Sequence, residues 1–124
     1  MRRFGFVASA VLLAASTSAI AATASPYDFT GTWLGEAHSG KRHATVDATL
    51  TSTGPTTFDG EFVLEGATRC LVRNGKLTKR VHWHVTCGLG NGAVSGRLNQ
   101  STNTIRGSFS LRGHVIVFSM TKSG

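Results

Sequence analysis

Acidic residues are scarce in this chain of 124 residues, which has six of them against thirteen lysines and arginines. All six lie between Asp28 and Glu65, where only Lys41 and Arg42 oppose them, whereas nine basic residues and no acid follow from Gly66 onward. A catalytic histidine needs a carboxylate to orient it, and the second half offers none. No G-x-S-x-G nucleophile motif occurs either. These absences argue against a hydrolase, and we expect a protein that is not an enzyme and has no cofactor.

Long hydrophobic runs are also missing, since a membrane-spanning helix takes about 20 strongly apolar residues and polar residues interrupt the first apolar stretch. The N-terminus has instead the three parts of a secretory signal peptide: Arg2 and Arg3, an apolar stretch over 4–13, and small residues over 14–24. Two A-x-A cleavage sites are present, and a transmembrane anchor is the alternative. We therefore expect a signal peptide (1–24) and a single domain (25–124) that is periplasmic or secreted.

Cysteine is limited to Cys70 and Cys87. In an exported protein an even count predicts a disulfide, with two free thiols as the alternative. Closing this loop would stabilise the fold by about 3 kcal/mol in the chain-entropy model. A disulfide that places the two cysteines opposite each other centres the connecting turn on 78–79. The turn-forming pair Asn74 and Gly75 is then expected to form a bulge or loop rather than the tip of a hairpin.

Helical periodicity is missing from the remaining chain, and alternation of apolar and polar residues replaces it. The alternation is clearest over 44–50, 58–65 and 105–112. Short, glycine-rich connections make neighbouring strands antiparallel. We therefore expect an all-β domain with eight strands closed into an up-and-down barrel, and a two-sheet β-sandwich is the runner-up. The expected strands are 30–37, 43–52, 57–65, 68–73, 81–87, 93–99, 104–111 and 114–121.

Two of these segments share a pattern, because 58–66 and 105–113 both read as an apolar residue, x, Gly, x, Phe, x, Leu, x, Gly. The spacing of Val and Leu upstream of each copy is also similar. An internal duplication would explain the match, and chance similarity between simple strand patterns is the alternative.

The segment Phe29–Gly35 resembles the first strand of the calycins, the lipocalin and avidin-like barrels, in which a Gly-x-Trp begins the strand and the Trp closes one end. This resemblance implies an eight-stranded barrel with Trp33 at one end. In lipocalins a late basic residue lies against that Trp, a role open here to Arg112 or Lys122. Avidins carry further tryptophans that contact their ligand. Here the only other tryptophan is Trp83, so the resemblance implies no named ligand.

Five aromatic residues fall in the apolar register of the predicted strands. They would either fill the barrel or line a small apolar pocket, and our first hypothesis is a binding protein for a small apolar ligand. The residues are Trp33, Phe58, Phe62, Trp83 and Phe109.

Basic residues gather around one predicted hairpin and on the outward face of later strands. Such a patch attracts anionic surfaces or an acidic protein, although it could serve solubility alone. Nucleic acid is not expected, because exposed aromatic residues for stacking are lacking. The residues are Arg69, Arg73, Lys76, Lys79, Arg80, Arg97, Arg106 and Arg112.

Our second hypothesis is an interaction or inhibitor domain that acts through this basic face and three loops, 38–43, 74–80 and 88–92. The glycine-rich 88–92 is expected to be a hairpin loop, since no helix follows to make it a phosphate loop. The uneven charge distribution also allows a homo-oligomer, in which the acidic half of one copy docks on the basic half of another.

Our third hypothesis is a metal-binding protein that uses His82 and His84. Their spacing can bring two imidazoles to one metal ion, but a convincing site needs further ligands, for which His38, His43 and His114 are the candidates. Two histidines exposed on an outer strand face are the alternative.

Overall fold

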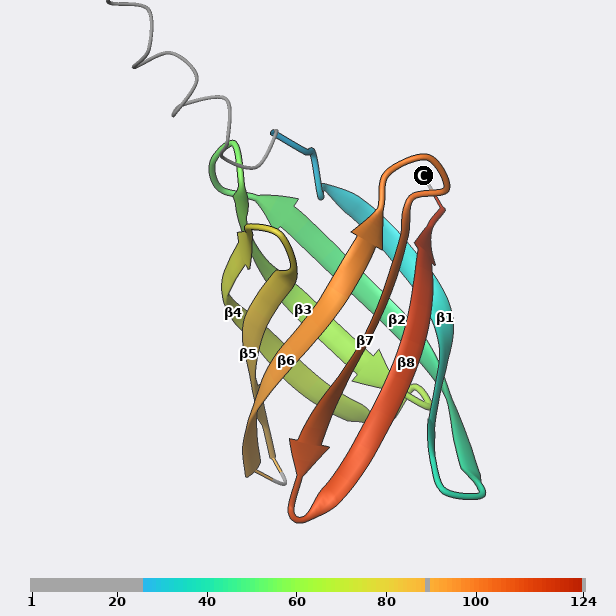
Figure 1. Cartoon of the computed structure of the whole chain (residues 1–124). Coiled ribbons are helices and arrows are strands. Elements are labelled where there is room, and N and C mark those ends of the chain that lie inside the picture. The colour runs from blue at the N-terminus through green and yellow to red at the C-terminus, as the bar shows by residue number, and fades with distance from the viewer. Residues whose placement is uncertain (1–25, 89, 124) are drawn as a thin grey trace, which may run out of the picture.

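Eight antiparallel strands form a closed barrel in chain order, with β1 also pairing with β8 (Figure 1). The structure, a computed structural model, describes residues 26–88 and 90–123, so the predicted signal peptide lies outside the described residues. The fold confirms the up-and-down barrel in preference to the sandwich. The strands are β1 (Gly31–Ser39), β2 (Arg42–Ser52), β3 (Thr57–Leu64), β4 (Thr68–Leu77), β5 (Val81–Cys87), β6 (Gly90–Asn99), β7 (Thr104–Leu111) and β8 (His114–Lys122).

The predicted alternation determines which side chains face the interior. In β5 the apolar residues, from Val81 to Cys87, are buried at every second position, and the polar residues between them are exposed. Successive side chains of a strand point to opposite faces, so a period of two buries one set. Closure of the sheet pairs both edge strands and leaves no open edge. Among the described residues, no helix has the length and hydropathy to span a membrane.

The disulfide between Cys70 and Cys87 is formed, with the two residues directly opposite in the β4–β5 register and their Cα atoms 4.1 Å apart. The register shifts between Arg73 and Lys76, so the strand continues past its predicted end at residue 73 through a bulge. The turn lies at 78–80, as the disulfide geometry required. The prediction that the Asn-Gly pair before it would not be the hairpin tip is confirmed.

Strand β6 begins earlier than predicted. Cys87 pairs with Gly90, so the strand begins three residues before its predicted start at residue 93. The expectation of a loop over 88–92 is therefore wrong for 90–92. Glycines there were interpreted as turn residues, but Gly92 lies where the backbone oxygen of Ser110 would be 2.6 Å from an added Cβ. Close strand packing, not a turn, requires glycine at this position.

The two similar segments of the sequence form β3 and β7, and their shared glycines have a common steric cause. An ideal Cβ on Gly60 would lie 2.0 Å from the backbone oxygen of Thr49, and one on Gly107 would lie 2.6 Å from that of Ser95. A larger residue at either place would push the neighbouring strand away.

One end of the barrel is closed by the N-terminal segment and Trp33, which is fully buried. Its Nε1 donates a hydrogen bond to the backbone oxygen of Phe29 at 2.9 Å. Lys122 is the register partner of Trp33, and its Nζ donates to the backbone oxygen of Asp28 at 2.8 Å. Of the two basic residues considered for this position, Lys122 is thus the one beside Trp33, whereas Arg112 lies in the β7–β8 turn at the other end.

Candidate functional site

The aromatic residues proposed as a ligand pocket pack against one another inside the barrel. Phe58 lies edge-on to Trp83 with ring centroids 5.7 Å apart, and Phe62 lies edge-on to Phe109 at 5.9 Å. Phe118 of β8 joins the two pairs, since its ring is 5.7 Å from that of Trp83 and 5.6 Å from that of Phe62. These contacts give the rings a core role, and binding of a ligand by them stays a prediction.

One buried side-chain nitrogen of the described residues lacks a hydrogen-bond partner. In the described part of the chain, Nε1 of Trp83 is the only buried side-chain nitrogen or oxygen atom without a hydrogen bond. Buried N–H groups are normally paired, because leaving one unpaired costs about 1 to 3 kcal/mol. The indole of Trp83 is therefore the feature of the core that packing alone does not explain.

His82 and His84 are exposed on the outer face of β5. In the register with β4, His82 lies opposite Lys76 and His84 lies opposite Arg73. A bound metal cation would thus have two cationic neighbours. No group of three potential metal ligands occurs within 26–88 and 90–123. The pair has the surroundings of an ordinary solvent-facing strand, and metal binding stays an untested prediction.

The predicted basic cluster does not form a single patch. Arg69 forms an ion pair with Glu61 at 2.7 Å. Arg112 and Arg80 lie at opposite ends of the barrel. The predicted loops also divide between the two ends: 38–43 and the described part of 88–92 lie at one end, and the turn at 78–80 lies at the other (Figure 1). A single contact region formed by all three loops is therefore ruled out by the topology. Of three further basic residues, Arg73 and Lys76 lie in β4 and Lys79 lies in the β4–β5 turn.

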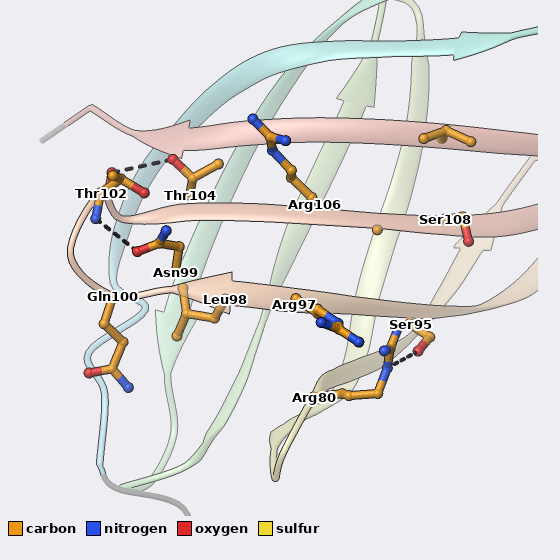
Figure 2. Close-up of a pocket in the computed structure, with 12 residues that line it drawn as sticks. Arg80, Ser95, Arg97, Leu98, Asn99, Gln100, Thr102, Thr104, Arg106 and Ser108 are labelled. Atoms are coloured by element: carbon orange, nitrogen blue, oxygen red, sulfur yellow. Dashed lines mark hydrogen bonds between the residues drawn. The ribbon is translucent and has the colours of Figure 1, made fainter.

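Three arginines instead line one open cleft of about 990 Å³ on the outside of β6, β7 and β8, which we call the arginine cleft (Figure 2). Arg97 of β6 lies directly opposite Arg106 of β7, and Ser95 lies opposite Ser108 in the same register. Arg80 comes from the β4–β5 turn, and its Nε donates to Oγ of Ser95 at 3.2 Å. In Figure 2 the guanidinium of Arg97 turns toward Arg80, whereas Arg106 extends over β8.

Local hydrogen bonds hold the rims of the arginine cleft. The side-chain oxygen of Asn99 accepts from the amides of Ser101 and Thr102 at 3.1 and 3.3 Å, which shapes the β6–β7 turn. On the other rim, the amide of Thr78 donates to the backbone oxygen of Arg80 at 2.9 Å and closes the β4–β5 turn. The strands and these turns therefore place the arginine backbones in a fixed arrangement.

The arginines of the cleft form no ion pair within the described residues. The ion pair between Glu61 and Arg69 is the only one within 4 Å in the parts of the chain that the structure covers. Arg106 of β7 is paired with Ser119 of β8, and Ser119 is paired on its other side with Glu36 of β1. Glu36 is therefore two strands away from Arg106. Like charges directly opposite on neighbouring strands destabilise a sheet. An anion bound in the cleft would remove that repulsion and accept hydrogen bonds from the guanidinium groups.

Part of this site was visible in the sequence and part was not. The alternation places Arg97 and Arg106 on the outward face, and both were predicted there. Ser95, Ser108 and Asn99 were missed, because what places them at the site is the pairing of Ser95 with Ser108 and of Asn99 with Thr104, beside the paired arginines. That pairing depends on the β6–β7 register, which a sequence pattern of alternation does not define.

Comparison with known proteins gave no match to a family model, to a curated protein or to a solved structure.

Proposed function

We propose that the protein is an exported, non-enzymatic binding protein that holds an anionic partner on the outer face of the barrel. The observation that carries the proposal is the direct opposition of Arg97 and Arg106, neither of which forms an ion pair among the described residues. Three guanidinium groups around one cleft provide planar donors suited to carboxylate, sulfate or phosphate oxygens.

Export is supported by two independent features. The N-terminal pattern of residues 1–24 is typical of a signal peptide. The disulfide between Cys70 and Cys87 is of a kind that persists in oxidising compartments and is rare in the cytosol. A periplasmic or secreted protein of this charge would meet anionic polymers and surfaces in its surroundings.

A small ligand inside a calycin-like barrel is the second candidate. The unpartnered Nε1 of Trp83 favours it, because an acceptor atom of a ligand beside the indole would satisfy this donor. The ring contacts of Phe58 and Phe118 with Trp83 argue for a filled core. Native mass spectrometry of the protein purified from its own host separates the two, since an interior ligand would add a discrete mass.

The salt dependence of binding tests the main proposal. We expect the purified protein to bind a negatively charged polymer or vesicle at about 0.05 M salt and to lose most of that affinity at about 0.5 M, because salt screens exposed charges. Uncharged dextran and neutral vesicles are the controls. Absence of binding to every anionic probe at low salt, or binding that salt leaves unchanged, would contradict the proposal.

A further inference from the structure

We propose that the arginine cleft is a binding site for a carbohydrate that carries sulfate or phosphate monoester groups. The inference rests on the proposed anion-binding function and adds the place and the chemical class of the ligand. It starts from the positions of three side chains, Arg80, Arg97 and Arg106, which all line the same cleft.

The arginines offer two places for an oxyanion. Arg80 is held by its hydrogen bond to Ser95, and Arg97 turns toward it, so the two guanidinium groups can share one anion (Figure 2). Arg106 is the cross-strand partner of Arg97 but extends the other way over β8, which separates a second positive site from the first. Arginine binds tetrahedral oxyanions with paired, charge-assisted hydrogen bonds. The cleft thus suits a ligand with more than one anionic group along its length.

The remaining lining points to carbohydrate between those groups. It supplies hydroxyl and carboxamide groups, including Ser108, Gln100 and Thr104, which can exchange hydrogen bonds with sugar hydroxyls. Val117 of β8 is 41% exposed and offers an apolar surface for the face of a sugar ring. The residues that line the cleft include no aromatic side chain, whereas sites for single-stranded nucleic acid commonly combine a basic groove with aromatic side chains on which the bases stack.

Three polymers with one backbone test this assignment: dextran, dextran sulfate and dextran phosphate. Each is titrated into the wild-type protein and into R97Q/R106Q at about 0.15 M salt, close to physiological screening. The matched control is R73Q/K76Q, which removes the same two charges from exposed positions of β4 outside the arginine cleft. Thermal unfolding of each variant shows that the barrel is intact.

We expect the wild type to bind at least one charged dextran and not the neutral polymer. R97Q/R106Q should lose about tenfold or more in affinity, since hydrogen bonds to charged groups are each worth at least that factor. The control should lose less than about threefold. The ratio of the two charged dextrans shows which ester the site prefers, and either preference supports the assignment.

Other outcomes overturn the inference in distinguishable ways. An equal loss in both double variants would refute the cleft as the site and leave the proposed function standing. Binding to anionic vesicles or single-stranded DNA, but to neither charged dextran, would refute carbohydrate as the ligand class. Failure to bind any anionic probe would refute the proposed function together with the inference.

Discussion

Arg97 of β6 and Arg106 of β7 are direct cross-strand partners on the outer surface of the barrel, and neither forms an ion pair within the described ranges. Opposed like charges cost stability, so Arg97→Gln is expected to raise the free energy of unfolding by about 0.2 to 1 kcal/mol at low salt. The gain should disappear at high salt, where the repulsion is screened. Urea unfolding at two salt concentrations measures it. A loss of stability at low salt would show that Arg97 has a structural partner.

The bond between Cys70 and Cys87 closes the β4–β5 hairpin. Reduction, or the double substitution C70A/C87A, is expected to lower the free energy of unfolding by about 3 kcal/mol, because the open chain gains conformational entropy when unfolded. Urea unfolding with and without a reductant is the measurement, and C70A/C87A with reductant controls for unspecific effects. Identical midpoints in the two conditions for the wild type would count against the bond.

The two tryptophans differ in how their indole nitrogens are satisfied. Trp33→Phe removes a donor that is paired with Phe29 and leaves the buried carbonyl oxygen unpaired, whereas Trp83→Phe removes a donor without a partner. Both substitutions delete a similar volume from the core. Trp33→Phe is therefore expected to be more destabilising by about 1 kcal/mol or more. Equal costs in thermal unfolding would indicate that Trp83 has an acceptor, such as a bound molecule.

The acid sensitivity of the barrel end follows from Asp28. The backbone amide of Thr30 donates to its carboxylate at 2.9 Å, and this hydrogen bond above all lowers the pKa of Asp28. A pKa lower in the folded than in the unfolded state means that the stabilisation is present above about pH 4 and is lost as the pH falls through the folded value. Unfolding midpoints measured from pH 6 downward should decline less in Asp28→Asn than in the wild type. A parallel decline would assign the effect to other carboxylates.

Glycine is required at the β4 bulge but not in the β5–β6 turn. An ideal Cβ on Gly75 would lie 2.5 Å from the backbone oxygen of Phe58 and 2.6 Å from its ring, whereas one on Gly88 would meet no atom within 4 Å. Gly75→Ala is expected to cost about 1 to 3 kcal/mol and Gly88→Ala less than about 0.5 kcal/mol. Comparable unfolding midpoints for the two variants would be inconsistent with the bulge.

The fold could be predicted because its main determinants are local. Alternation in segments such as 81–87 determined which side chains are buried, and the cysteine pair determined the β4–β5 register. Strand ends were less accurate where glycine was present. Gly90 and Gly92 were interpreted as turn residues, but in β6 the close approach of neighbouring strands, not a reversal of the chain, accounts for glycine at position 92.

The candidate site was harder to predict because it depends on register and on side-chain reach. Alternation shows that Arg97 and Arg106 point outward, but their direct opposition depends on the conformation of the 100–103 turn. Arg80 joins them only through a turn hydrogen-bonded by Thr78 and a contact with Ser95, neither of which has a sequence signature. For the aromatic residues, the sequence alternation showed that they point into the barrel, but it did not show that their rings pack against one another.

The most direct test of anion binding at the arginine cleft is a titration of the protein with glucose 6-sulfate, followed by the backbone amide resonances in NMR spectra. The largest shifts are expected at Ser95, Arg97, Arg106 and Ser108, and they should be absent with glucose. Shifts that centre on the interior around Trp83 or on β4, or no shift at ligand concentrations that saturate weak sites, would contradict the account.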